Sequence, residues 1–305
     1  MTRNSPRILL LIVSVLVVFG LSAPAISAEK MPIKVLAVIA GDEEIGRLKN
    51  PTGLFFDEAK KRLYITDSGN KRLISFDNEF KYIAELSHEA MVLPASIVRN
   101  KEDNFIFVDA SRQEVMFVEV KKESIRPFEF LGVPQAGEPF YPGRIAINRA
   151  TGVLHVVDRL NKRIISAGQN GKFIRAMTVS DKGFFGFNDI KVDEADNVYA
   201  IDSVGGVLYV FDGTGGLVSR IPVALSGVRF PGSLAVDKNG LIYVTDMQGD
   251  MIFVFNRAGA LQYTLSRPGV KEGELEHPSY IYIDSEGRIF IIDGDRIQVF
   301  SESKG

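Results

Sequence analysis

One motif recurs six times along the 305-residue chain, and this recurrence restricts the fold more than any other feature of the sequence. In its clearest copy, Pro51 opens a short apolar segment, a second segment ends at Asp67, and a third ends at Phe76. An aspartate ends the second segment in every copy, and these marker aspartates are Asp67, Asp109, Asp158, Asp202, Asp246 and Asp293. Their spacings of 42, 49, 44, 44 and 47 residues fit one unit of three or four short strands per copy.

The residues inside each copy predict strands and hairpins, and no segment reads convincingly as a helix. Segments such as 242–244 and 252–254 are β-branched and aromatic, which is typical of strands. Turn sequences such as Asp-Lys-Asn-Gly at 237–240 lie between them. Small sheets at this period arrange radially, so we predict an all-β, six-bladed β-propeller. The alternative is an open stack of repeats, which would need capping repeats that the sequence does not show.

The order of the segments predicts how the ring closes. The last copy stops after its third strand near Phe300, while a lone apolar strand at 33–39 precedes the first copy. We therefore expect residues 33–39 to complete the sixth blade, which would remove exposed sheet edges that favour aggregation. Residues 29–305 form one predicted domain, whose blade cores cover about 51–77, 94–118, 142–167, 187–212, 231–256 and 278–300.

The clearest copy resembles a known repeat. Its pattern, Pro-x-Gly-[Leu/Ile/Val] followed by Tyr-[Val/Ile]-x-Asp-x-x-Asn-x-Arg-[Ile/Leu]-x-x-Phe, is similar to the NHL repeat and is best seen over Pro51–Phe76. The resemblance extends over nearly all of residues 33–300 and implies an NHL-type six-bladed propeller. It says little about function, although exported bacterial proteins that resemble this chain often form part of envelope assemblies or sensory systems.

Residues 1–28 have the layout of an export signal. Arg3 and Arg7 precede an apolar run of 14 residues, 8–21, and small residues follow with candidate cleavage positions after Ala25 or Ala28. The run is shorter than the roughly 20 residues that span a bilayer, and no cysteine follows it to carry a lipid anchor. We predict a cleaved signal peptide and a periplasmic or secreted product that is neither a lipoprotein nor an integral membrane protein.

Composition removes several function classes. The formal net charge is −2, which argues against a nucleic-acid binder with a basic surface. The absence of cysteine excludes a thiol nucleophile, cysteine-bound zinc and iron–sulfur clusters. The sequence motifs of serine hydrolases, zinc proteases, phosphate-binding loops and dinucleotide-binding folds are also missing. We expect no cofactor, while a divalent metal in the central channel remains an open alternative.

The three histidines need separate treatment, because the amidating lyase that cleaves peptidylhydroxyglycine resembles this fold and binds zinc through histidines on the propeller axis. His155 occupies a position that aromatic packing residues hold in other copies, and His88 lies in the linker after the first copy. Only His277 leads toward the axis. We therefore do not expect a shared three-histidine metal site.

The marker aspartates invite a catalytic or metal-binding interpretation, but their regular recurrence favours a structural one. One aspartate per blade, each at a strand end, suits capping of the N–H groups in the turn that follows. Positions at which the copies differ are better candidates for selectivity.

The most variable position lies two residues after the start of each copy, where the inner strand begins near the channel. It is occupied by Gly53, Ser96, Arg144, Asp189, Ser233 and Tyr280. Arg159, directly after the third marker aspartate, is expected at the same opening. We predict that Arg144 and Arg159 bind a carboxylate or phosphate near Asp189 and Tyr280. The alternative is an Arg144–Asp189 ion pair that only closes the ring.

Phe184 and Phe185 lie in a glycine-flanked linker, where burial is difficult. An exposed aromatic patch there would suit a protein or peptide partner. We therefore predict an exported, partner-binding or scaffolding propeller that uses the connecting loops of its third and fourth blades. The alternative is a metal-dependent enzyme with an axial site, similar to a lyase or a lactone hydrolase.

Overall fold

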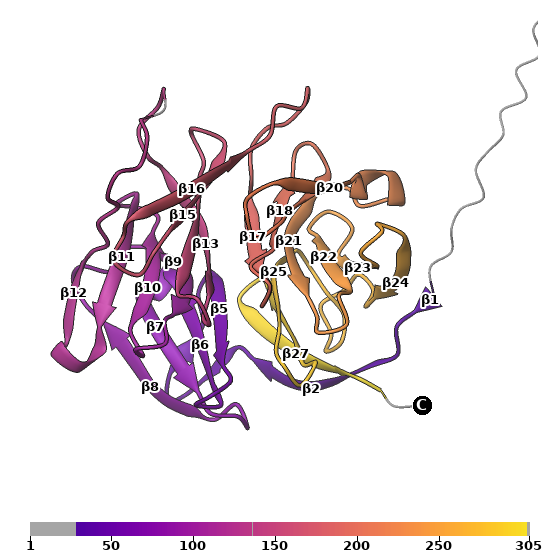
Figure 1. Cartoon of the computed structure of the whole chain (residues 1–305). Coiled ribbons are helices and arrows are strands. Elements are labelled where there is room, and N and C mark those ends of the chain that lie inside the picture. Colours follow the sequence, from indigo (N-terminus) through magenta and orange to yellow (C-terminus); the bar gives the residue numbers. More distant parts are fainter. Residues whose placement is uncertain (1–28, 136, 304–305) are drawn as a thin grey trace, which may run out of the picture.

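The chain forms six sheets of four or five strands each, antiparallel except for one short parallel edge strand, and they are arranged as the blades of a β-propeller (Figure 1). The computed structural model describes residues 29–135 and 137–303, so the predicted signal peptide and its cleavage positions lie outside the described residues. Within this part of the chain, no helix is both long enough and apolar enough to cross a membrane.

Each blade runs from an inner strand beside the channel to an outer strand. The strands of blade 1 are β5 (Pro51–Asp57), β6 (Arg62–Asp67), β7 (Arg72–Phe76) and β8 (Tyr82–Ser87). Blade 2 contains β9 (Pro94–Arg99), β10 (Phe105–Asp109), β11 (Glu114–Glu119) and β12 (Ser124–Pro127). Blade 3 contains β13 (Pro142–Asn148), β14 (Val153–Asp158), β15 (Arg163–Ala167) and β16 (Phe173–Thr178).

The second half of the ring follows the same plan. Blade 4 contains β17 (Asp189–Val192), β18 (Val198–Asp202), β19 (Val207–Phe211) and β20 (Leu217–Ile221). Blade 5 contains β21 (Pro231–Val236), β22 (Ile242–Asp246), β23 (Met251–Phe255), β24 (Leu261–Leu265) and, parallel to β24, the short β1 (Glu29–Lys30). Blade 6 contains β25 (Pro278–Ile283), β26 (Ile289–Asp293), β27 (Arg296–Glu302) and β2 (Ile33–Ile39).

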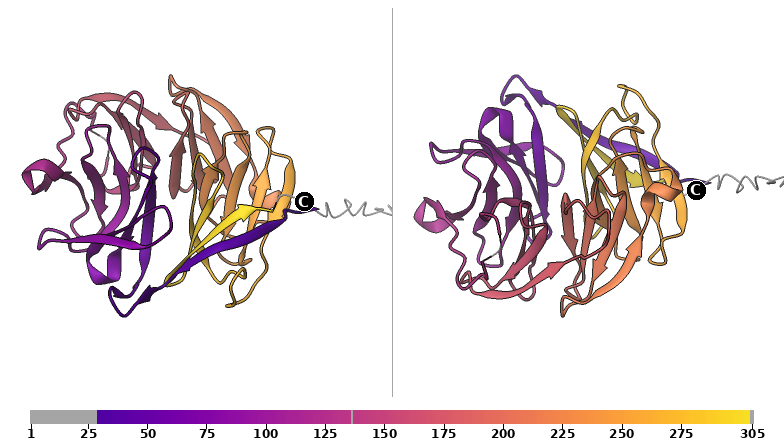
Figure 2. Two further views of the ribbon diagram at one scale, coloured as in Figure 1. Left: turned by 90° about the horizontal axis from the view of Figure 1, so that it is seen from below. Right: turned by 90° about the horizontal axis from the view of Figure 1, so that it is seen from above.

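The predicted closure of the ring is confirmed. Strand β2 pairs antiparallel with β27, from Ile33 opposite Glu302 to Ile39 opposite Ile297. Figure 2 shows the indigo β2 beside the yellow β27 in both views. The inner strands β25 and β5 also touch, so the ring closes at its centre as well as at its rim. The beginning and the end of the domain thus share one sheet.

Some elements were not predicted from the repeats. A hairpin of β3 (Gly41–Asp42) and β4 (Gly46–Arg47) connects the closing strand to blade 1. Three short 3-10 turns are η1 (Ser68–Asn70), η2 (Val120–Lys122) and η3 (Val223–Ser226).

The core lies between neighbouring blades. Large apolar side chains point from each sheet into the next; Phe56 of blade 1 stacks on Phe290 of blade 6, with ring centroids 5.8 Å apart. The hydrophobic burial of one such phenyl group contributes on the order of 2 kcal/mol. This inter-blade packing explains why the strands are apolar on both faces, as expected for sheets that are covered on both sides.

A second repeated residue organises the side of the ring that carries the turns between first and second strands, which we call the hairpin face. Each copy has an aspartate or asparagine six residues after its first residue. The side-chain oxygen of this residue accepts a hydrogen bond from an N–H group of the turn. These residues are Asp57, Asn100, Asn148, Asp193, Asp237 and Asp284. Such Asx turns satisfy backbone donors that the hairpin itself leaves unpaired.

One hairpin turn also clamps two blades together. Asp196, in the first turn of blade 4, accepts hydrogen bonds from Arg175 at 2.6 Å and from Asn148 at 3.2 Å, both in blade 3. The buried His155 lies 3.3 Å from the same carboxylate through Nε2, and its Nδ1 lies 2.9 Å from Ser166 Oγ. Burial alone would raise the pKa of Asp196, but the hydrogen bonds from His155 and Arg175 outweigh it and lower the pKa to about 2.

We expect Asp196→Asn to destabilise the fold at neutral pH by about 2 kcal/mol, which corresponds to a pKa lowered from its usual 3.8 to about 2. Because the folded-state pKa is the lower one, this contribution is present above about pH 4 and is lost as the pH falls toward 2. Urea unfolding between pH 7 and pH 2 measures it, and the variant should show a flatter pH dependence.

The matched control is Asp103→Asn, at the equivalent turn position of blade 2. Asp103 is 40% exposed; it pairs with Lys60 of blade 1 at the surface and lies 3.5 Å from Arg99. Because these ion pairs are exposed to solvent at Asp103, its removal should change the free energy of unfolding by under about 1 kcal/mol. Equal effects of the two substitutions would contradict the inter-blade clamp.

Candidate functional site

The marker aspartates define the side of the ring that carries the linkers between blades, which we call the loop face. All six are buried, and each accepts a hydrogen bond from a backbone N–H of the linker that enters its own blade. The donors are the N–H groups of Lys49, Val92, Tyr141, Phe185, Phe230 and Glu276. The turn-capping role expected from the sequence is seen at Asp109, Asp202 and Asp246, which also accept N–H groups of the turn that follows.

In blades 1, 3 and 6 an arginine side chain, rather than an N–H group of the following turn, donates to the marker aspartate. Arg163 donates from Nε to Asp158 at 2.8 Å and from Nη1 to the carbonyl of Pro134 at 3.1 Å, so it ties the marker aspartate to the preceding linker. Arg72 and Arg296 make the corresponding contacts in blades 1 and 6. The aspartates and these arginines are therefore occupied by structural hydrogen bonds.

The structure brings Arg144, Asp189 and Tyr280 together at the channel, although they come from blades 3, 4 and 6. The Arg144 guanidinium lies over the Tyr280 ring, 4.7 Å from its centroid, and donates from Nη1 to the carbonyl oxygen of Thr52 in blade 1. Its Nε lies 3.9 Å from Asp189 Oδ1, which is too far for a hydrogen bond. Arg144 thus reaches across the channel.

Lys191 is a residue of the channel mouth that was not predicted from the sequence. Its Nζ donates to Asp189 Oδ2 at 2.8 Å and lies 4.3 Å from the centroid of the Tyr280 ring. The same carboxylate oxygen accepts hydrogen bonds from Ser233 Oγ at 2.5 Å and from the Leu234 N–H at 3.2 Å. Asp189 Oδ1 is buried and has no partner among the described residues. Lys191, rather than Arg144, is therefore the close ionic partner of Asp189.

Arg159 lies at the rim of the same channel mouth. A Cβ added to Gly143 would stand 2.7 Å from Arg159 Nε, so the glycine lets the arginine side chain lie flat across the inner strand. Its guanidinium makes no hydrogen bond or ion pair within the described chain. The side chain stays accessible at the rim, but nearby protein atoms desolvate the guanidinium and lower its pKa, and the positive charge of Arg144 lowers it further.

Arg144 and Arg159 line one small cavity of about 150 Å³ in the channel mouth. Thr52, Ser96 and Tyr141 are also part of its lining. The cavity combines two guanidinium groups with hydroxyl groups, which are the side chains that recognise carboxylates and phosphates. The geometry favours the anion-binding prediction over a simple Arg144–Asp189 bridge.

The two aromatic residues in the linker before blade 4 have different environments. Phe185 is 55% exposed, as expected for a surface site. Phe184 is only partly exposed and packs against Phe187 and Tyr209, with ring centroids 4.8 and 5.6 Å away. The expectation of an exposed Phe184 is therefore corrected: the next blade supplies aromatic partners for it.

Phe185 belongs to a larger set of exposed apolar side chains on the loop face, which we call the apolar arc. Its members are Leu160, Phe185, Val204 and Leu225, with 48%, 55%, 61% and 85% of their surface exposed. They lie on neighbouring loops of the third to fifth blades. A Cβ on Gly186 would lie 3.6 Å from the Lys162 side chain, and the Ala224 N–H donates to the Gly206 carbonyl.

The histidines do not meet at the channel. His155 is buried in the clamp described above, while His88 and His277 are exposed on separate linkers. Over residues 29–135 and 137–303, no group of three or more His, Cys, Asp or Glu side chains is placed to hold a metal ion.

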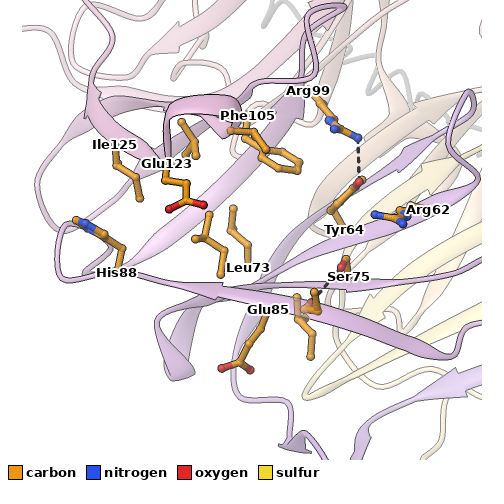
Figure 3. Close-up of a pocket in the computed structure, with 15 residues that line it drawn as sticks. Arg62, Tyr64, Leu73, Ser75, Glu85, His88, Arg99, Phe105, Glu123 and Ile125 are labelled. Carbon is orange, nitrogen blue, oxygen red and sulfur yellow. Dashed lines mark hydrogen bonds between the residues drawn. The ribbon is translucent and has the colours of Figure 1, made fainter.

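A larger groove of about 550 Å³ opens between blades 1 and 2, away from the channel mouth (Figure 3). Its walls include Leu73 and Ile125, and Glu123 and His88 lie along one side. The Arg99 side chain donates to Tyr64 Oη at 2.9 Å at one end of the groove. None of the candidate residues predicted from the sequence lines it.

Comparison with solved structures shows the fold. The chain is similar to selenomethionine-substituted virginiamycin B lyase from Staphylococcus aureus, with a TM-score of 0.64 and 14% identity over 89% of this chain and 99% of that chain. It is similar to a streptogramin B lyase, with a TM-score of 0.63 and 12% identity over 90% and 98% of the two chains. A catalytically inactive virginiamycin B lyase variant from S. aureus with quinupristin gives a TM-score of 0.62 and 15% identity over 82% and 80%.

No protein-family model matches the chain, and no curated protein matches it either. The structural likenesses support a six-bladed β-propeller and, at these identities, the fold alone. The NHL-type repeat therefore stays a prediction from the sequence motif.

We expect Arg159→Met to raise the melting temperature by roughly 1 to 3 °C, because it removes an unpaired charge that faces Arg144 while keeping an apolar stem. Met247, the equivalent residue of blade 5, already lies across Gly232 in the same way. Differential scanning calorimetry of both proteins measures the shift. A clear decrease would show that Arg159 is a structural residue.

Proposed function

We propose that this chain is an exported β-propeller that binds a protein or peptide partner on the loop face of its third and fourth blades. The observation that carries the proposal is the apolar arc beside a cationic channel mouth. Exposed apolar surface that clusters in this way is typical of protein interfaces. The signal-like sequence of residues 1–28 supports a periplasmic or secreted location, and the NHL-type repeat pattern supports a scaffolding role.

Of the eleven large exposed apolar side chains in the described chain, four cluster on the apolar arc, while the others are spread over outer strands and other loops. All four members of the apolar arc lie on linkers or turns of the loop face. The first turns of the hairpin face are instead built from Asx residues with polar and charged neighbours, such as Asp193-Glu194-Ala195-Asp196. A partner that buries apolar surface therefore gains more on the apolar arc than on these hairpin turns.

We expect the double variant Phe185→Ser/Leu225→Ser to lose capture of the partner while remaining folded, because both side chains are exposed and the backbone contacts of their linkers are retained. The measurement is crosslinked capture with the exported protein in cells that produce it, quantified by mass spectrometry.

The control is Val120→Thr/Val218→Thr, which alters two exposed apolar residues that lie outside the loop face. The proposal requires at least one protein that is captured by the wild type and by the control but not by Phe185→Ser/Leu225→Ser. If all three recover every protein equally, the proposal is wrong.

A second candidate is a metal-dependent enzyme with an axial site, which the likeness to streptogramin B lyases favours. The residues at the mouth of this chain favour the binding role instead. Arg144, Arg159 and Lys191 place positive charge where a divalent cation would have to bind, and Asp189 already has Lys191 at 2.8 Å.

We therefore expect the purified exported protein to contain no stoichiometric divalent metal, and we expect a chelator to leave its melting temperature unchanged. Elemental analysis and thermal melts with and without chelator test this. A bound ion at one per chain, with a lower melting temperature after chelation, would favour the enzyme.

A further inference from the structure

The charges at the channel mouth do not balance. Arg144, Lys191 and Arg159 are cationic, whereas Asp189 is the one carboxylate of the described chain within ion-pair distance of any of them. Lys191 neutralises Asp189 through a 2.8 Å contact, and two further donors complete the coordination of that carboxylate oxygen. The two arginines are left with a surplus of two positive charges.

Arg144 is held in position despite this surplus, and Arg159 lies against the inner strand of its blade. Arg144 is fixed by the Thr52 carbonyl on one side and by the Tyr280 ring beneath its guanidinium. Arg159 lies in the space that the missing side chain of Gly143 leaves, so that an alanine there would displace it. Guanidinium groups held close together repel each other unless an anion lies between them.

The cavity that the two arginines share has room for such an anion. Its volume of about 150 Å³ corresponds to roughly five water molecules at liquid density. Tyr141 in the lining carries a hydroxyl group that can donate to an oxyanion. The hydroxyl groups of Ser96 and Thr52 are already hydrogen-bonded within the protein. A group with two negative charges would satisfy both guanidiniums at once.

The surroundings favour a peptide over a free inorganic ion. Leu160 follows Arg159 directly in the chain and is the first member of the apolar arc, which continues through Phe185 and Val204. An inorganic phosphate would use the arginines and leave these side chains in water. A peptide with acidic and apolar residues side by side would use both surfaces.

We propose, building on the proposed function, that the channel mouth binds an acidic segment of the partner, with two carboxylates paired to Arg144 and Arg159 and neighbouring apolar residues on the apolar arc. Arg144 and Arg159 are the specificity-determining residues of this site, and Tyr280 and Gly143 position them. Lys191 keeps Asp189 from competing for Arg144.

The experiment is isothermal titration calorimetry of the exported protein with the blocked peptide acetyl-Asp-Asp-Leu-Phe-amide, carried to the millimolar range. Two comparison probes are used. Acetyl-Asn-Asn-Leu-Phe-amide has the same length and apolar residues but lacks the two carboxylates. Inorganic phosphate is an anion without any peptide or apolar side chain. The protein variants are Arg159→Met, whose side chain fits as Met247 does in blade 5, and the matched Arg229→Met in an exposed linker of the loop face.

We expect the acidic peptide to bind the wild type and Arg229→Met alike, and to bind Arg159→Met about tenfold or more weakly, as loss of one charge-assisted pair implies. The asparagine peptide should bind the wild type about tenfold or more weakly as well. Added salt should weaken the binding of the acidic peptide.

Three results would overturn the inference: no binding of the acidic peptide, equal binding by wild type and Arg159→Met, or phosphate binding as tight as that of the peptide. These results differ from failure of the proposed function. If Phe185→Ser/Leu225→Ser loses the captured partner while Arg159→Met keeps it, the loop-face interface holds and the acidic-segment inference fails. If the arc variant keeps the partner, the proposed function itself fails.

Discussion

The loop face depends on hydrogen bonds that six buried aspartates accept from the linkers between blades. A buried carboxylate without donors is strongly unfavourable, so each marker aspartate must be surrounded by N–H groups if the blade is to pack at all. The linker supplies those groups directly before the inner strand begins. The requirement therefore fixes where each inner strand enters the channel, and it fixes the position of Arg144, Asp189 and Tyr280 relative to one another.

This requirement is met in two ways, which divide the six linkers into two kinds. In blades 1, 3 and 6 an arginine joins the aspartate to linker carbonyls, as Arg296 does with Val270 and Glu274. In blades 2, 4 and 5 the aspartate instead caps its own turn. The linker before blade 4 is bound in another way, by the ion pair of Arg220 with Asp181. The exposed residues Phe185 and Leu225 lie in linkers of the second kind, which bind the marker aspartate through backbone N–H groups.

The repeat made most of the fold predictable, since the position of each marker aspartate and the unpaired strand 33–39 require only the period of the sequence. The site was predictable in part. Lys191 was missed because only the start of each inner strand was compared, although its separation of two residues from Asp189 places both side chains on one face of the strand. Phe184 could not be judged from its own glycine-rich linker, because its burial comes from Tyr209. Val204 and Leu225 are 21 residues apart in sequence and become neighbours only through the contact of Gly206 with Ala224.

Comparison of blade 3 with blade 5 shows which features of the channel rim the fold requires and which are specific to the candidate site. At the rim, Met247 folds across Gly232 in the same way as Arg159 folds across Gly143, so this position can be filled by an uncharged side chain without changing the backbone. Blade 3 instead carries a guanidinium that lacks a partner in the described chain and lies beside a second one. Natural proteins keep locally unfavourable charges chiefly where binding uses them. The position after the marker aspartate can therefore hold an uncharged side chain, as Met247 shows in blade 5. That blade 3 carries the charged Arg159 there instead is the physical argument for a binding site at the channel mouth.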